Sequence, residues 1–265
     1  MKDIVVTGAY GGMGRTTVSA LKKRGFRVFA LDRKVGEAEE NIVPVEVDVR
    51  DRESVSRAAE TVKSMSDGLF AVLHFAGVYM LDSLVEISAE NFEKIFEINV
   101  FGAFYVNRVL MPLLKKGSLI ILTTSELAPL DPLPFTGLYA VTKAALDKYA
   151  YSLRMELQLL GVSVSVLRAG AVSTEMLGVS TSALDAFCAK TELYTCNAER
   201  FRRIVDSVEA KSVPPEKVAA KMLSVLKKRK PRFVYSLNGN PLLKLLNLLP
   251  KRLQLFAIRQ VLKTR

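Results

Sequence analysis

Residue types that build metal centres and disulfide frameworks are scarce in this chain. Its 265 residues include one histidine and two cysteines, Cys188 and Cys196, which are not in a CxxC arrangement. These numbers argue against a disulfide framework and against a zinc site. We therefore expect two free thiols, as in a reducing cytosol, and no bound metal.

Long apolar runs are also missing. No uninterrupted stretch of about 18 apolar residues occurs, which predicts that the chain has no transmembrane helix. The first three residues lead directly into a short apolar run, too short for the core of a signal peptide. We therefore expect a cytoplasmic protein.

Negative charge is absent from one part of the chain. Residues 217–265 contain 13 of the 38 Lys and Arg residues and no Asp or Glu, and the net charge is +11. The other residues, with 25 basic and 27 acidic side chains, are almost neutral. Because the positive charge is confined to the end of the chain and does not form a basic footprint along all of it, we expect no nucleic-acid partner.

Strand and helix patterns alternate over most of the chain. Several of the strands are apolar almost throughout, as expected when helices cover both faces of a parallel sheet. The alternation predicts a single α/β domain of the Rossmann type over residues 1–235, with a doubly wound parallel sheet of about seven strands. We expect strands at 3–7, 27–31, 43–47, 69–75, 118–123 and 162–167, and helices at 16–24, 52–65, 89–114 and 139–160.

A glycine-rich turn, TGAYGGMG at residues 7–14, follows the first strand and opens the first helix. Glycines allow a tight turn and a close approach of the backbone to a pyrophosphate, and the helix N-terminus offers free N–H groups to it. The turn predicts a dinucleotide site. Its candidate cofactor-binding residues are Gly8, Tyr10, Gly12, Met13 and Gly14.

Acidic residues end the second and third strands. Asp32 is placed to accept hydrogen bonds from ribose hydroxyls and to repel a 2′-phosphate, which favours NAD. Arg33 and Lys34 follow directly and would instead neutralise a 2′-phosphate, so NADP stays an alternative. Asp48 and Val49 are candidates for the wall of the adenine pocket.

A tyrosine and a lysine are four residues apart in a predicted helix and so share one face. The phenol of a free tyrosine has a pKa near 10, and a nearby ammonium would lower it towards neutral pH. Tyr139 is therefore the candidate acid and base, and Lys143 the residue that tunes it. A hydroxyl that could polarise the substrate oxygen is available at the end of the fifth predicted strand, where the resemblance described next favours Ser125, with Thr124 as the alternative.

These motifs, in this order, resemble those of the single-domain short-chain dehydrogenase/reductase family. The glycine turn matches its TGxxxGxG, residues 139–143 match its YxxxK, and Asn99 matches its helix asparagine. In HFAG at residues 74–77, Ala76 and Gly77 match the end of the family's NNAG, whereas both asparagines are replaced. The resemblance extends from residue 3 to about residue 235.

The resemblance implies several roles. It makes Lys143 a ligand of the nicotinamide ribose, Asn99 the anchor of a water leading to that lysine, and 176–212 a substrate lid. Val172 and Thr174 would contact the nicotinamide carboxamide. The only histidine, His74, would be a residue at a strand end beside the cofactor. A homodimer or homotetramer is implied as well.

The sequence thus predicts an NAD(P)-dependent oxidoreductase that interconverts an alcohol and a ketone or aldehyde. Its substrate is expected to be hydrophobic, such as a sterol-, retinoid- or lipid-like molecule. Two alternatives remain. One is a non-catalytic NAD(P)-binding sensor, favoured by the altered NNAG segment. The other is a scaffold at a membrane surface.

The C-terminal tail, residues 236–265, is basic and amphipathic. Leu242, Leu245, Leu246 and Leu249 share one helical face. After Pro250, a second apolar face contains Leu253, Phe256 and Val261. One interpretation is peripheral contact with an anionic membrane, or a frame around the entrance for a lipid-like substrate. The other is packing of the tail on its own domain or on a partner subunit.

Overall fold

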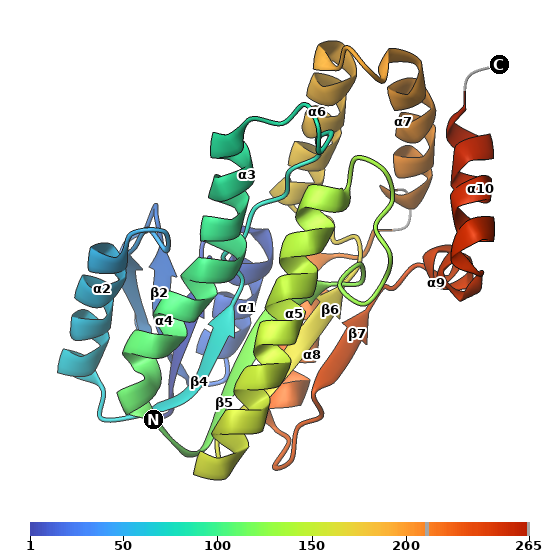
Figure 1. Cartoon of the computed structure of the whole chain (residues 1–265). Helices are drawn as coiled ribbons and strands as arrows, with labels where there is room; N and C mark the ends of the chain where they lie inside the picture. The colour runs from blue at the N-terminus through green and yellow to red at the C-terminus, as the bar shows by residue number, and fades with distance from the viewer. Residues whose placement is uncertain (210–211, 264–265) are drawn as a thin grey trace.

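Seven parallel strands form one sheet in the computed structural model, as predicted (Figure 1). The structure describes residues 1–209 and 212–263, with side chains described except at 177–181, 196 and 204–209. The strand order is β3-β2-β1-β4-β5-β6-β7, so the two halves of the sheet meet between β1 and β4. The strands are β1 (Asp3–Thr7), β2 (Arg27–Asp32), β3 (Ile42–Glu46), β4 (Leu69–His74), β5 (Leu114–Ser125), β6 (Ser163–Ala169) and β7 (Val234–Leu237).

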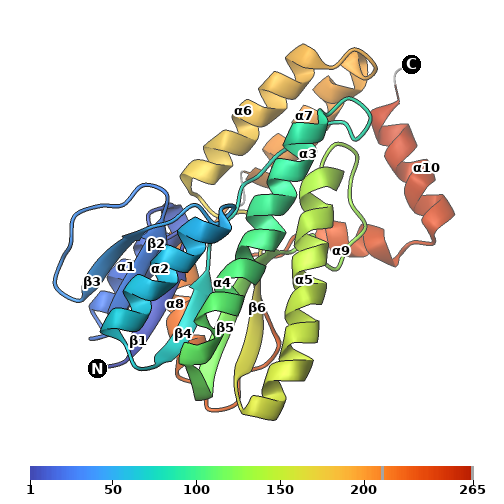
Figure 2. The same cartoon turned by 60° about the vertical axis from the view of Figure 1, so that its left-hand side comes forward.

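Helices cover both faces of the sheet (Figures 1 and 2). Helices α2, α4 and α5 pack on one face, and α1 and α8 pack on the other. The helices are α1 (Gly12–Lys22), α2 (Arg52–Met65), α3 (Ala89–Phe96), α4 (Gly102–Leu110), α5 (Gly137–Leu157), α6 (Glu175–Lys190), α7 (Thr195–Glu209), α8 (Pro215–Leu226), α9 (Pro241–Leu248) and α10 (Lys251–Leu262).

The apolar strands divide their side chains between these two layers. In β1, Val5 belongs to the core under α2, α4 and α5, whereas Ile4 and Val6 belong to the core under α1 and α8. Successive side chains of a strand point to opposite faces, so a strand covered on both sides needs apolar residues at every position. This explains why these strands are continuous apolar runs in the sequence.

The long helix expected at 89–114 is wrong as a single element. It is divided by a π-helix (Glu97–Phe101) between α3 and α4, and by a 3-10 helix (Met111–Leu113) that contains Pro112. β5 then begins at Leu114, four residues earlier than expected. A π-helical turn interrupts the regular α-helical period, and apolar spacing alone does not reveal it.

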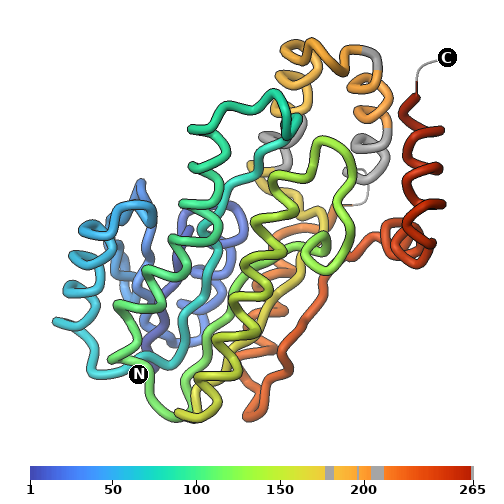
Figure 3. Tube along the Cα trace, in the orientation of Figure 1, coloured from blue at the N-terminus to red at the C-terminus, as the bar shows by residue number. Residues whose placement is uncertain are grey.

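Within the segment predicted as a lid, 176–212, the described residues form the helical pair α6 and α7, and residues 210 and 211 lie outside the described part of the chain. Leu184, Phe187 and Phe201 from this pair form a third core, to which Leu262 of α10 contributes. The trace in Figure 3 shows the chain leaving β7, forming α9, and then running as α10 beside α7. Among the described residues, no helix is both long and apolar enough to cross a membrane. The division between a domain at 1–235 and a tail at 236–265 stays a prediction.

Candidate functional site

Glycine is required in the turn between β1 and α1 because neighbouring atoms leave no room for a side chain. Gly8 has a φ of +66°, and a Cβ there would lie 2.5 Å from the backbone nitrogen of Ala76. A Cβ on Gly14 would lie 2.0 Å from the carbonyl oxygen of Gly8, and one on Gly12 would lie 2.6 Å from the Cβ of Thr174. The turn is therefore held tightly against the loops after β4 and β6.

Asp32 closes this turn from the end of β2. Its Oδ2 accepts a hydrogen bond from the backbone N–H of Tyr10 at 2.9 Å, and its Oδ1 accepts from the N–H of Arg33 at 2.7 Å. The Tyr10 hydroxyl is buried without a hydrogen-bond partner among the described residues. Met13 lines the cavity described below, whereas Arg33 and Lys34 are exposed.

The predicted adenine-pocket residues have other contacts in this structure. Arg50 forms an ion pair with Asp48 at 2.6 Å, and hydrogen bonds from its guanidinium lower the pKa of the Asp48 carboxyl. Val49 is buried and packs against α4, where a Cβ on Gly102 would lie 2.8 Å from its Cγ2. A role of Asp48 and Val49 in an adenine pocket stays a prediction.

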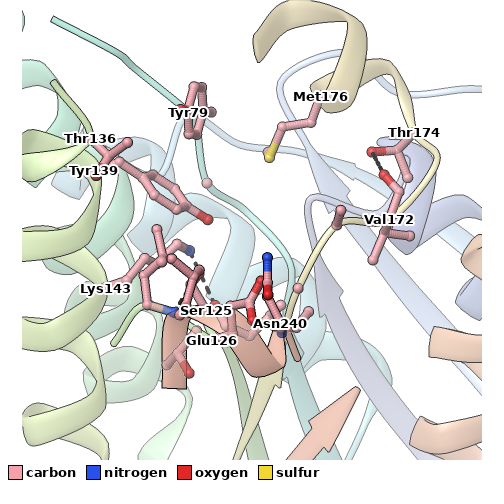
Figure 4. A pocket seen from close by; sticks show the side chains of 18 of the residues that line it. Tyr79, Ser125, Glu126, Thr136, Tyr139, Lys143, Val172, Thr174, Met176 and Asn240 are labelled. Carbon is pink, nitrogen blue, oxygen red and sulfur yellow. Dashed lines mark hydrogen bonds between the residues drawn. The ribbon is translucent and has the colours of Figure 1, made fainter. Parts of the chain in front are cut away.

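A cavity of about 300 Å³ brings Ser125, Tyr139 and Lys143 together (Figure 4). Ser125 ends β5, and the other two project from the first turns of α5. The Lys143 Nζ lies 5.6 Å from the centre of the Tyr139 ring and donates a hydrogen bond to the Thr123 carbonyl oxygen at 3.2 Å. The Tyr139 hydroxyl points into the cavity. The one-turn spacing of YxxxK thus places both side chains on the same wall.

Burial dominates the ionisation of this pair. It raises the pKa of Tyr139 to about 12, although a hydrogen bond with Ser125 acts in the opposite direction. It also lowers the pKa of Lys143 to about 8. The expectation that the Lys143 ammonium lowers the Tyr139 pKa is therefore wrong for the protein alone: burial raises that pKa, and the opposing interaction comes from Ser125 and not from Lys143.

Asn99 lies in the π-helix and holds the loop that follows β4. Its Oδ1 accepts a hydrogen bond from the Val78 N–H at 2.8 Å, and its Nδ2 donates to the Val78 carbonyl at 3.0 Å and to Thr142 at 3.1 Å. A Cβ on Gly77 would lie 3.2 Å from the Asn99 Oδ1 and 3.4 Å from the Lys143 Nζ. Asn99 therefore positions the loop beside Lys143, and its role as a water anchor stays a prediction.

His74 ends β4, as predicted, but it is buried and does not line the cavity. Its Nδ1 lies 3.5 Å from the Thr7 Oγ1, and its Nε2 lies 2.8 Å from the Asn107 Oδ1. Asn107 in turn donates to the Tyr149 hydroxyl at 3.1 Å. Burial lowers the pKa of His74 to about 4, so the imidazole is neutral near pH 7.

The remaining walls of the cavity come from distant segments. Val172 and Thr174, which were predicted as cofactor contacts, line the cavity from the segment between β6 and α6. Ala76 is adjacent to the Gly8 turn rather than in the cavity wall. Further lining residues that were not singled out as site residues are both apolar and polar: Tyr79, Glu126, Leu133, Thr136, Phe201, Asn240, Leu242 and Leu243.

The sequence offers different signals for Glu126 and for the lining residues of the tail. Glu126 directly follows Ser125, so its place beside the site was open to prediction. Asn240, Leu242 and Leu243 come from the tail, which was expected either to frame the substrate entrance or to pack elsewhere, and their place in the cavity wall agrees with the first expectation. Glu126 links the two groups, because its carboxylate accepts a hydrogen bond from the Asn240 N–H and burial raises its pKa.

A doubly wound parallel sheet, a close glycine turn at its centre, and a tyrosine and lysine in the adjoining cavity define a Rossmann-type α/β protein with a potential redox site. The family model described as "short chain dehydrogenase" matches residues 2–185, and this chain belongs to that family. The resemblance seen in the motifs is thereby confirmed. No cluster of three or more potential metal ligands is found among the described residues.

Known proteins agree with this assignment. The chain is 35% identical over 179 residues to the uncharacterized oxidoreductase YbbO of Escherichia coli, covering 65% of this chain and 66% of that protein. It is 34% identical over 189 residues to estradiol 17-beta-dehydrogenase 2 of Mus musculus, covering 66% and 49%, respectively. The matched part thus spans between about half and two thirds of these relatives.

The fold also matches a solved structure over its full length. A short chain dehydrogenase from Burkholderia cenocepacia, crystallised in complex with NADP, superimposes with a TM-score of 0.74 and covers 100% of both chains at 24% identity. This likeness supports the single-domain Rossmann-type fold, including the C-terminal helices.

Proposed function

We propose that this protein is an NAD(P)-dependent oxidoreductase that interconverts an alcohol and a ketone or aldehyde on a hydrophobic substrate. The observation that carries the proposal is the convergence of Ser125, Tyr139 and Lys143 on one cavity beside the glycine turn. Family membership supports the reaction class.

The residues around the turn fit a dinucleotide. The glycine positions leave a backbone cradle that a Cβ at Gly8, Gly12 or Gly14 would fill, and α1 begins with no side chain capping its first N–H groups. When bound, the nicotinamide would supply or accept the hydride. Gly8 to Gly14 would hold the diphosphate, Asp32 the adenosine ribose, and Val172 and Thr174 the nicotinamide end.

The chain's own groups would manage the proton. In reduction, the Tyr139 hydroxyl would donate its proton to the substrate oxygen; in oxidation, the phenolate would take the proton back. The Ser125 hydroxyl would donate a hydrogen bond to the same oxygen, and Lys143 would hold the nicotinamide ribose. Because the pKa of Tyr139 is about 12 in the protein alone, proton release during oxidation would require a nearby positive charge, which the nicotinamide ring of the oxidised cofactor would supply.

The cavity walls support a hydrophobic substrate. Leu127, Leu133, Met176 and Phe201 line them, together with Leu242 and Leu243 from the tail. A largely apolar cavity with a few polar groups at one end suits a bulky alcohol or ketone whose oxygen meets Ser125 and Tyr139. One relative carries the name estradiol 17-beta-dehydrogenase, which agrees with a sterol-like substrate without identifying it.

Asp32 supports NAD over NADP, because a carboxylate at the end of β2 would repel a 2′-phosphate on the adenosine ribose. Arg33 and Lys34 keep NADP as the alternative. A homodimer or homotetramer, a cytoplasmic location, peripheral membrane contact by the tail, and a lid function for 176–212 all remain predictions.

The test is an absorbance assay of the reduced nicotinamide, with both cofactors and a panel of sterols, retinoids and long-chain alcohols. Tyr139→Phe should lower kcat/KM at least about 100-fold, as expected for loss of an acid/base group. Its affinity for the cofactor, measured by fluorescence, should be unchanged. Equal rates for the variant and the parent would refute the mechanism, and cofactor binding without turnover on any substrate would favour the sensor alternative.

A further inference from the structure

The inner side of the C-terminal tail is held to the rest of the protein by specific contacts. The Asp131 N–H donates to the Asn247 Oδ1 at 2.6 Å, and the Asp131 carboxylate contacts both Lys251 and Gln254. At the far end, Leu262 is buried in the core of α6 and α7. Helices α9 and α10 are therefore a fixed part of the fold with one side already occupied.

These two helices also expose large apolar side chains to water. On α9 and the residue that follows it, Leu245, Leu248 and Leu249 are 60%, 80% and 38% exposed. On α10, four further apolar side chains are more than half exposed: Leu253, Leu255, Phe256 and Val261. An apolar surface of this size on a soluble fold indicates a partner.

Charge indicates what that partner is. The tail has no acidic residue, and Arg252 and Arg259 are exposed on the same helix as the apolar side chains. A second copy of the chain would bring an equally basic surface against this one, and like charges oppose such a contact. A partner that fits these helices therefore has apolar groups for the exposed leucines and negative charges for the arginines. An anionic lipid bilayer offers both.

We propose that α9 and α10 dock on an anionic lipid bilayer, with their exposed leucines at the acyl boundary and their basic residues among the headgroups. In Figure 1 these helices form one edge of the molecule, outside α7. Neither is long enough to span the bilayer, so this is an interfacial contact.

Docking at this place bears on the cavity. Asn240, Leu242 and Leu243, at the beginning of α9, line the cavity that also contains Tyr139. The docked helix is therefore also a wall of the candidate substrate site. This second part of the inference rests on the proposed function: a water-insoluble alcohol or ketone dissolved in the bilayer would enter the cavity past α9 without crossing bulk water.

Vesicle flotation of the full chain, without cofactor or substrate, tests the docking. Vesicles of phosphatidylglycerol and phosphatidylcholine in equal parts should bind the protein, and vesicles of phosphatidylcholine alone should bind it far more weakly. Changing both Leu248 and Leu255 to Glu should reduce the partition coefficient at least about 100-fold, since each leucine loses its burial. Arg252→Gln with Arg259→Gln should reduce it about 30-fold on the anionic vesicles alone.

A matched control separates this face from general surface hydrophobicity. Leu159 and Leu160, 83% and 61% exposed after the end of α5, receive the same two changes to Glu and should leave flotation unchanged. Circular dichroism checks that every variant is folded. Absence of flotation by the full chain, or equal losses in both leucine pairs, would overturn the proposal.

Two further readouts complete the test. If sedimentation velocity shows a dimer that the Leu248 and Leu255 changes dissociate, and the parent does not float, the face is a contact between copies and the proposal is wrong. With a substrate dissolved in the vesicles, the same changes should raise KM, whereas kcat/KM for a water-soluble alcohol should stay unchanged. Flotation does not require turnover, so the docking can hold even if the proposed reaction fails.

Discussion

Acid should destabilise this protein through His74, and replacing that residue with asparagine should remove much of the effect. His74 is 4% exposed, and burial lowers its pKa from 6.5 to about 4, with the hydrogen bond to Asn107 only partly opposing the shift. Between these two pH values the unfolded chain binds a proton that the folded protein does not. The contribution of the neutral His74 side chain to the free energy of unfolding is therefore fully present above about pH 6.5, and it is lost as the pH falls towards 4.

The size of the effect follows from the shift. One pKa unit corresponds to about 1.4 kcal/mol, so on lowering the pH from 7 to 4 the imidazole should reduce the free energy of unfolding by about 3 kcal/mol. His74→Asn keeps a side chain able to bond with Asn107 and Thr7 but removes the titration. The variant is expected to be less stable at pH 7, because the asparagine side chain is smaller than the imidazole and leaves space in a packed site.

Urea unfolding of both proteins at pH 7 and pH 4 measures this difference. The other titrating groups are common to both, so they cancel when the pH-dependent loss of the variant is subtracted from that of the parent. A remaining difference of about 3 kcal/mol is the expected result. If the two proteins lose the same free energy of unfolding between these pH values, the imidazole is not buried in its neutral form and the reasoning is refuted.

Two further predictions concern the proposed cofactor site. Gly14→Ala should abolish detectable binding of NAD(H) in a fluorescence titration, because its Cβ would lie 2.0 Å from the Gly8 carbonyl oxygen; retention of parental affinity would show that the turn relaxes freely. Asp32→Ser should raise the ratio of kcat/KM with NADP to that with NAD at least about tenfold, because a carboxylate no longer opposes the 2′-phosphate; an unchanged ratio would remove Asp32 from the adenosine site.

The sheet was readable from the sequence because its strands are buried on both faces and therefore consist of continuous apolar runs. Short-range geometry was readable as well: four-residue spacing in α5 places Tyr139 and Lys143 on one wall, and glycine spacing marks the turn at Gly8 and Gly14. Each of these features depends only on residues close together along the chain.

The features that sequence reasoning missed depend on the folded environment. The π-helix around Asn99 leaves no mark in apolar spacing. The pKa of Tyr139 was expected to fall and instead rises, because the degree of burial is a tertiary property. The tail was expected either to frame the substrate entrance or to pack elsewhere; the place of Leu242 and Leu243 in the cavity wall depends on where the chain returns after β7, and no motif in the tail decides between these alternatives.

The hydrogen bond between the Glu126 carboxylate and the Asn240 N–H joins the part of the chain that carries the proposed proton-transfer groups to α9, which lines the cavity. Because α9 contributes to neither core of the sheet, a substitution at Leu242 or Leu243 would change the shape of the cavity while leaving the packing of the strands and α5 intact.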